Sequence, residues 1–300
     1  MQNNTVAQSA NMHNVSGTPF LGDKTAKRTT NEWNDLFRRF QSRLILAPLV
    51  AAVFLTGCVS GGEAGAGLEE MIANESSGNV NTPSPHDSPG GIWKGTVTTQ
   101  SGVSYPSIGL VSESGDLRFI TPGSDQTSGT FTVTGNTFTA NLRSYVPSGF
   151  FTYIHPVHGS ASGSIHKRSA LSGNTSLHDA TTASFSFNYD AIYERDSSLS
   201  AISGNYSKSD GAGYTVTYSI DAAGVFTGSD TNGCMLNGHV ELLNKDYNMY
   251  KANVIVTNCN EANGHYFGLA SLVDGASQND TLLFSLECVE DLIAGSITRA

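Results

Sequence analysis

The sequence has few charged residues and no long apolar run, and these two shortages exclude several classes of protein. Asp, Glu, Lys and Arg together make up only 14% of the 300 residues. No apolar stretch reaches the roughly 18 residues that a membrane-spanning helix needs, which excludes a polytopic membrane protein. The formal net charge is −10 and no basic stripe occurs, so the electrostatic footprint of a nucleic-acid-binding protein is missing.

Sequence motifs for catalysis are also scarce. The chain has no Gly-x-Ser-x-Gly motif, no phosphate-binding glycine loop and no paired acid motif. Ser164-Ile-His-Lys167 matches the S-x-x-K pattern of penicillin-interacting enzymes. That chemistry needs a helical turn between the two side chains, whereas this segment is rich in Gly and Ser and extended in character. We therefore expect no enzymatic activity and no cofactor.

A short apolar segment near the N-terminus has the features of an export signal. Arg38, Arg39 and Arg43 precede a run of 12 mostly apolar residues, 44–55, and small residues follow at Thr56 and Gly57. A basic flank, a short apolar run and a small-residue cleavage site are typical of a secretory signal peptide. We expect residues 1–57 to be a leader, although the 43 residues before the apolar run are more than such a signal usually has.

The end of this segment, Leu55-Thr-Gly-Cys58, resembles the bacterial lipobox. The resemblance implies that diacylglycerol is attached to the Cys58 thiol, that the chain is cleaved before it and that an acyl chain such as palmitate joins the new amino group. Two or three acyl chains anchor a protein stably to a membrane. The residue after the cysteine is Val59 and not Asp, which in this family implies attachment to the bacterial outer membrane. Whether the protein faces the cell surface or the periplasm stays open. The alternative is a short buried helix that happens to end in Cys.

The segment after Cys58 predicts a flexible tether. Residues 58–90 are rich in Gly, Ser and Pro, and only 68–72 could form a helical turn. Such a composition cannot bury enough apolar surface to offset the ordering entropy. The tether would separate the folded part from the membrane.

From residue 91 the sequence predicts an all-β protein made of two tandem antiparallel units, 91–200 and 201–300. Alternating or β-branched runs are separated by clusters of Gly, Asn and Asp. The pattern N-x-[FY]-x-A-N-[LV] occurs at 136–142 and again at 248–254, an offset of 112 residues. Gly91-Ile-Trp93 and Gly204-Asn-Tyr206 open the two units in the same way. Chance similarity among Thr- and Gly-rich strands is the alternative.

The second unit divides into eight expected strands. They cover 202–207, 214–221, 224–229, 234–243, 249–259, 265–273, 280–288 and 292–299. Short strands joined by short turns favour an up-and-down or meandering barrel, since closure removes exposed sheet edges.

This arrangement resembles two groups of known proteins that contain small β-barrels. Gly91-Ile-Trp93 in an opening strand and Arg299 in a closing strand resemble lipocalin and avidin-like barrels. Because Trp93 and Arg299 lie in different units, the packing of these two side chains in lipocalins cannot be transferred. Two barrels behind a lipid tether also resemble the transferrin-binding and factor-H-binding surface lipoproteins, in architecture and without a shared motif.

The cysteines predict one disulfide in the second unit. If 234–243 and 249–259 form a hairpin, the residue numbers of facing partners add up to a constant. Leu243 and Tyr250 give 493, and Cys234 and Cys259 also give 493, so the two cysteines should lie opposite each other. Exported proteins retain disulfides. Cys288 would then be an unpaired, buried thiol. The alternative pairs Cys288 with Cys259.

Two further groups of side chains are candidates for binding. His155, His158 and His166 lie close together in the sequence, with His178 following, but no metal-binding spacing accompanies them, so we expect no metal site. A possible ligand lip comprises Trp93, Tyr105, Phe150 and Tyr153, with Phe151 beside them. Aromatic residues in strands belong more often to a core.

Two classes of function remain. The first is a membrane-anchored, non-enzymatic binding or interaction lipoprotein whose partner is a protein, a glycan or a small ligand. The second is a structural lipoprotein of the cell envelope with filled barrels. A ligand-accessible cavity would favour the first class, and filled interiors with a flat apolar patch would favour the second.

Overall fold

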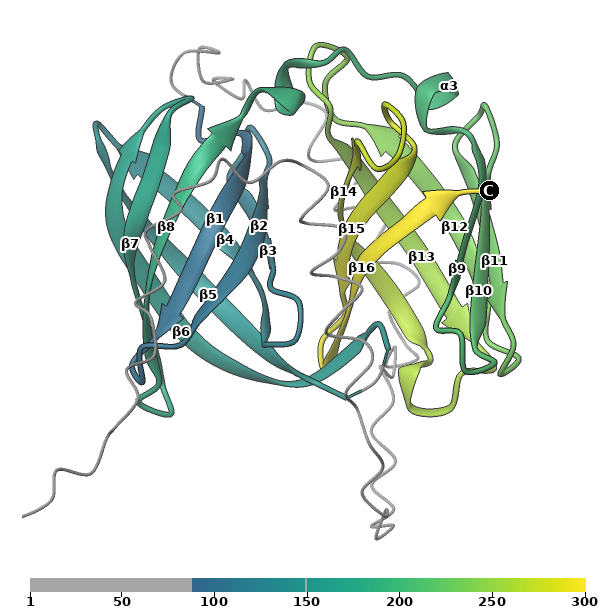
Figure 1. The fold of residues 1–300 in the computed structure, drawn as a ribbon, viewed down its shortest axis with the longest axis horizontal. Coiled ribbons are helices and arrows are strands. Elements are labelled where there is room, and N and C mark those ends of the chain that lie inside the picture. The colour runs from purple at the N-terminus through teal and green to yellow at the C-terminus, as the bar shows by residue number, and fades with distance from the viewer. Residues whose placement is uncertain (1–87, 149) are drawn as a thin grey trace, which may run out of the picture.

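Within residues 88–148 and 150–300, which this computed structural model describes, the fold is all-β, as the sequence predicts. Sixteen antiparallel strands form two closed barrels of eight strands each, placed side by side (Figure 1). Barrel 1 contains β1 to β8 and is drawn in blue and teal, and barrel 2 contains β9 to β16 and is drawn in green and yellow.

Consecutive strands pair with each other in both barrels, which is the up-and-down arrangement. Barrel 1 closes through the β1–β8 pairing, and barrel 2 closes through β9–β16. The strands of barrel 1 are β1 (Gly91–Thr99), β2 (Ser104–Val111), β3 (Asp116–Ile120), β4 (Gln126–Thr134), β5 (Thr137–Pro147), β6 (Thr152–His166), β7 (Ala170–Leu177) and β8 (Thr182–Asp190). The strands of barrel 2 are β9 (Gly204–Ser209), β10 (Thr215–Ile220), β11 (Val225–Asp230), β12 (Met235–Leu242), β13 (Tyr250–Thr257), β14 (Gly264–Val273), β15 (Thr281–Glu287) and β16 (Asp291–Arg299).

Helical segments are short and lie in connections. The 3-10 turn η1 (Ala191–Glu194) and the helix α3 (Leu199–Ile202) link the barrels, and η2 (Asn260–Ala262) follows β13. The Ser198 hydroxyl caps α3 by accepting a hydrogen bond from the Ala201 amide.

Period-two patterning places alternate side chains inside each barrel. In β10, Val216, Tyr218 and Ile220 are buried, while the two residues between them are exposed. The repeated motif occupies the fifth strand of each barrel, β5 and β13, where its aromatic, Ala and branched positions are all buried. The two halves of the sequence therefore build matching barrels.

The glycines at the second turn of each barrel are also equivalent. Gly115 and Gly224 have φ angles of +89° and +85°. A Cβ atom would lie 2.2 Å from the Phe131 carbonyl oxygen at Gly115 and 2.4 Å from the Val240 carbonyl oxygen at Gly224. Only glycine allows both the conformation and this close approach.

The barrels are joined through the sheet itself, because β16 changes partner along its length. Its C-terminal end pairs with β9, where Thr298 faces Ser207. Its N-terminal end pairs with the start of β6 of barrel 1, where Ile293 faces Thr152. The long β5–β6 hairpin thus leaves barrel 1 and completes the wall of barrel 2 (Figure 1).

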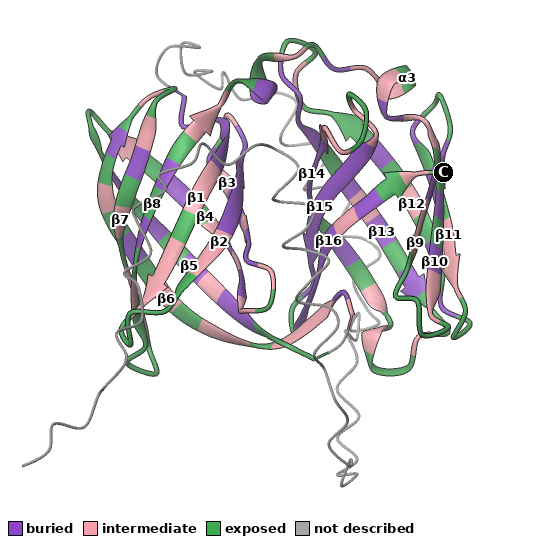
Figure 2. Cartoon of the chain, in the orientation of Figure 1, coloured by how far each residue is buried: buried purple, intermediate pink, exposed green. Residues whose placement is uncertain are grey.

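Three apolar cores follow from this arrangement. Two line the barrel interiors, and the third lies between the barrels, with Leu110 and Tyr145 from barrel 1 and Leu269, Leu283 and Leu292 from barrel 2. Every residue of β15 is buried because one of its faces lines the interior and the other faces barrel 1 (Figure 2). The barrels therefore pack as one unit.

A buried ionic cluster lies beside the third core. Arg118 of β3 and Glu287 of β15 are 2% and 3% exposed, and Arg118 Nη2 lies 3.0 Å from Glu287 Oε1. Arg143 reaches the same oxygen at 2.6 Å, and the Tyr145 hydroxyl donates to Oε2 at 3.1 Å. Burial raises the pKa of Asp116, which pairs with Arg118, despite that arginine. Removing one partner would leave a buried charge uncompensated.

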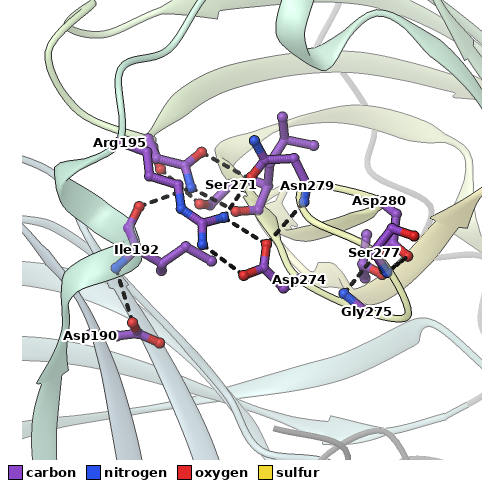
Figure 3. Close-up of polar contacts among 12 residues, drawn as sticks. Asp190, Ile192, Arg195, Ser271, Asp274, Gly275, Ser277, Asn279 and Asp280 are labelled. Atoms are coloured by element: carbon purple, nitrogen blue, oxygen red, sulfur yellow. Dashed lines mark hydrogen bonds and ion pairs between the residues drawn. The ribbon is translucent and has the colours of Figure 1, made fainter.

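The linker between the barrels is held by a second polar group. Arg195 donates to both carboxylate oxygens of Asp274, at 2.6 and 2.7 Å, and to Asn279 Oδ1 at 2.8 Å (Figure 3). The backbone N–H of Asn279 in turn donates to Asp274 Oδ1. The Asn248 side chain spans from the Ile192 carbonyl to the backbone of β14. These contacts fix the β14–β15 loop to the linker.

Part of the expected tether belongs to the folded protein. Ser88, Pro89 and Gly90 are buried, and the Ser88 hydroxyl donates to the Glu113 carbonyl oxygen at 3.3 Å. The expected boundary at residue 90 therefore falls inside packed structure. The rest of the expected tether, residues 58–87, lies outside the described residues, as does the leader.

Candidate functional site

Barrel 1 contains an apolar cavity of about 120 Å³. Its walls are mainly aromatic and aliphatic side chains from β3, β4, β5 and β8, including Phe119, Phe131, Phe138, Phe185 and Phe187. A cavity of this size is close to the roughly 150 Å³ void that accepts benzene in a protein core. The interior can therefore accommodate a small apolar group.

Small side chains at one level of the barrel create this space. A continuous inward-facing row runs across neighbouring strands through Ala140, Ala161, Thr175 and Ala183. All four line the cavity. In an eight-stranded barrel the interior is just wide enough for side chains to fill, so four small residues in one row leave it open.

Barrel 2 is filled at the same level. The corresponding row runs through Ala252, Gly268, Leu286 and Ile293. The seventh and eighth strands thus contribute Leu and Ile where barrel 1 has Thr and Ala. The residual void in barrel 2 is about 30 Å³, room for little more than a water molecule.

An aromatic side chain from barrel 1 fills barrel 2 further. Phe151 precedes β6, is 7% exposed and belongs to the core of barrel 2, with its ring centroid 5.8 Å from that of Phe284. Its carbonyl oxygen accepts a hydrogen bond from the Ala294 amide at 3.0 Å. Gly295 makes the space, since a Cβ there would lie 2.4 Å from the Phe151 ring. The β5–β6 connection therefore helps to fill the core of barrel 2.

Lys208 borders this inserted ring. Its ammonium donates to the Ser296 carbonyl oxygen at 3.0 Å and lies 5.5 and 5.2 Å from the ring centroids of Phe150 and Phe151. Burial lowers the pKa of Lys208 to about 8. The ring contacts offset part of the cost of burying this charge.

The cavity of barrel 1 opens at the end from which the β5–β6 hairpin departs. Three loops border this mouth: 100–103, 121–125 and 178–181. Thr99 and Thr181 line both the cavity and an outer hollow of about 480 Å³ between the first and third loops. The apolar cavity and the polar hollow therefore adjoin at these two threonines.

Loop 121–125 holds a carboxylate at the cavity. Asp125 is half-buried, lines the cavity and accepts a hydrogen bond from the Ser144 hydroxyl at 3.4 Å. Burial raises the pKa of Asp125, and the negative charge of Asp179 in loop 178–181 raises it further. The mouth therefore carries two acidic groups, and its three loops contain no Lys or Arg.

The fully buried Gln126 keeps this loop in place. Its carboxamide oxygen accepts from the Thr121 amide at 3.0 Å, and its nitrogen donates to the carbonyl oxygens of Thr121 and Ser124 at 2.6 and 3.0 Å. Because both the oxygen and the nitrogen of the Gln126 carboxamide form hydrogen bonds to this loop, the loop is held in place without a ligand.

A wider polar groove of about 550 Å³ lies outside barrel 1, beside the ionic cluster. Asp116, Arg118, Arg143 and Glu287 line it, and these side chains pair with one another. Opposite charges are matched within the cluster, which fits a role in joining the barrels.

The aromatic residues expected to form a ligand lip are not gathered in one place. Trp93 is 1% exposed in the core of barrel 1, where its ring makes a T-shaped contact with that of Tyr189 at a centroid distance of 5.3 Å. Tyr105 is half-buried on β2, Phe150 packs against the core of barrel 2, and Tyr153 packs against the core between the barrels. The expectation fails because Trp93, Phe150 and Tyr153 pack in three separate cores, and Tyr105 belongs to none of them.

Within the described residues, the candidate histidines are exposed, and none belongs to a group of three potential ligands close enough to share an ion. His155, His158 and His166 lie along β6, and the His158 ring lies 6.4 Å from that of His178 between centroids. In the described part of the chain, Asp230, Cys234 and Cys259 are the one group of three potential ligands close enough to share an ion. Both of those sulfurs are used in a disulfide.

That disulfide joins Cys234 and Cys259, as predicted, but the predicted hairpin register is wrong by one residue. Ladder partners of β12 and β13 sum to 492, as in Met235 and Thr257. Asn258 adopts a left-handed conformation, with φ of +57°, and the extra residue brings Cys259 opposite Cys234 beyond the ladder. The alternative pairing with Cys288 is excluded.

Cys288 is buried, as expected, in the core of barrel 2. None of the described cysteines is a free thiol, so the expectation that Cys288 is unpaired is wrong. Cys58, the expected lipidation site, lies outside the described residues.

Sequence reasoning missed the residues that define the site. Thr175 and Ala183 drew no attention because small residues in strands carry no motif, and Asp125 sits in an ordinary Pro-Gly turn sequence. A strand-by-strand alignment of the two units could have found Thr175 and Ala183, because Leu286 and Ile293 occupy the equivalent positions in barrel 2.

Comparisons with known proteins give no assignment: no protein-family model, no curated protein and no solved structure matches this chain. Among residues 88–148 and 150–300, no helix has the length and apolar character required to span a bilayer.

Proposed function

We propose that this protein is a non-enzymatic binding lipoprotein whose barrel 1 receives a small apolar ligand or the apolar end of a larger one. The observation that carries the proposal is the open, phenylalanine-lined cavity in barrel 1. Ligand pockets are typically concave and apolar, with a few polar groups at fixed positions. The cavity and its acidic mouth have that character.

The proposal includes a membrane anchor. The lipobox-like Leu55-Thr-Gly-Cys58 supports lipid attachment at Cys58, and Val59 supports the outer membrane. Barrel 1 would then present its binding site at the membrane surface. The alternative, a structural envelope lipoprotein, draws support from the filled interior of barrel 2.

Titration with 1-hexanol, followed by amide chemical shifts in the NMR spectrum, tests the binding site. We expect saturable shifts at residues that line the cavity, and none in the interior of barrel 2. Ala140→Leu fills the cavity and should abolish the shifts, whereas Ala252→Leu at the matching place in barrel 2 should leave them. Absence of saturable shifts up to the solubility of hexanol would refute the binding site.

Labelling with radioactive palmitate tests the anchor. The unaltered chain should incorporate label in a bacterial host, and Cys58→Ser should incorporate none and remain unprocessed. Label retained by the Cys58→Ser variant would refute lipid attachment at this residue.

A further inference from the structure

The charges at the mouth of barrel 1 bear on the kind of ligand that enters it. The cavity itself offers apolar carbon over most of its surface, so it selects the apolar part of a ligand without fixing its polar end. Any polar end must lie at the entrance, among loops 100–103, 121–125 and 178–181.

Two carboxylates supply negative charge at this entrance. Asp125 lines the cavity, and Asp179 is exposed on the opposite loop, close enough for its charge to act on Asp125. The three loops contain no Lys or Arg, and His178 is their single basic side chain. The entrance thus disfavours an anionic head group and favours a cation.

The carboxylate of Asp125 also retains hydrogen-bonding capacity. Among the described residues, the Ser144 hydroxyl supplies its hydrogen bond, at a long 3.4 Å to Oδ2. A carboxylate can accept about four hydrogen bonds. A primary ammonium, with three donors, matches an acceptor that has open positions and is partly removed from water.

We propose that barrel 1 binds an aliphatic primary amine, with its alkyl chain in the cavity and its ammonium on the Asp125 carboxylate. This inference rests on the proposed binding function and specifies its ligand class. Gln126 positions the loop that carries Asp125, so binding requires little rearrangement.

Three six-carbon probes that differ in the head group test the proposal: hexylamine, 1-hexanol and hexanoate. Titrations at pH 8 keep the amine charged, the carboxylate ionised and an ordinary imidazole neutral. We expect hexylamine to bind about three- to tenfold more tightly than hexanol, the range of a partly exposed charge-assisted hydrogen bond. Hexanoate should bind more weakly than hexanol.

Asp125→Asn should bring hexylamine to the affinity of hexanol and leave hexanol unchanged. Asp179→Asn is the matched control at the exposed carboxylate, where we expect less than a threefold loss for the amine. Raising the ionic strength should reduce the preference for the amine and leave hexanol binding as it was.

The outcomes separate the two proposals. If hexanol binds and hexylamine binds no better, or if Asp125→Asn keeps the amine preference, the head-group assignment is wrong and the apolar site stands. If neither hexanol nor hexylamine binds, the proposed function itself fails. Circular dichroism of each variant shows whether a loss of binding reflects loss of the fold.

Discussion

Barrels 1 and 2 have the same number of strands, the same up-and-down pairing and the same motif on their fifth strands, yet only barrel 1 is hollow. Two inward positions account for much of the difference, Thr175 and Ala183 against Leu286 and Ile293. The β5–β6 connection adds to it by leaving barrel 1 and filling barrel 2 with Phe151. In a duplicated fold, a few side chains and one loop decide which copy can bind.

The largest expected effect follows from removing the Phe151 ring, which the β5–β6 connection contributes to the core of barrel 2. Phe151→Ala should lower the free energy of unfolding by about 3–5 kcal/mol, as for a buried Phe that leaves a cavity. Hydrogen exchange should show the loss of protection mainly in β9, β15 and β16, which surround the ring. Phe150→Ala, at a half-buried position, should cost less. Equal loss of protection in both barrels would contradict the assignment of Phe151 to barrel 2.

A smaller effect is expected from enlarging equivalent side chains in the two barrels. Ala252→Leu overpacks barrel 2 and should lower the free energy of unfolding by about 1–3 kcal/mol. Ala140→Leu enters the existing cavity of barrel 1 and should leave stability unchanged or slightly raised. Urea denaturation of both variants measures the difference, and equal losses would mean that barrel 1 is packed as tightly as barrel 2.

The smallest effect concerns the buried charge at the edge of barrel 2. The pKa of Lys208 falls from 10.5 to about 8, so between these pH values the unfolded chain binds more protons than the native protein. Stability should therefore rise with pH across this window. Lys208→Met should remove that rise and, at pH 7, raise the free energy of unfolding by on the order of 1 kcal/mol, after allowance for partial exposure. Denaturation curves at pH 7, 9 and 10.5 check the slope.

Local patterns in the sequence were enough to predict the fold class and the strands of the second unit. Alternation and turn residues place each of the eight expected strands within a few residues of β9 to β16. The expected hairpin predicted the disulfide correctly. It did not predict the strand register, because Asn258, in a left-handed conformation, adds one residue between the end of the ladder and Cys259.

The candidate site could not be predicted in the same way. The sequence places Phe150 and Phe151 in the first unit and groups them with a possible ligand lip. Their contacts with Phe284 and Tyr214 are made across the barrels, and no periodicity in the sequence encodes such distant packing. The cavity depends on the volumes of side chains that become neighbours only after both barrels close.

The partner change of β16 also governs how other molecules can attach to this protein. Each of the sixteen described strands has a paired neighbour on both sides, and the pairing of β16 with β6 joins the two rings. A foreign strand therefore finds no fully unpaired edge strand among these sixteen, which disfavours self-association into fibrils by strand addition. Whatever docks here must use loops, side-chain surfaces or the hollow of the first ring.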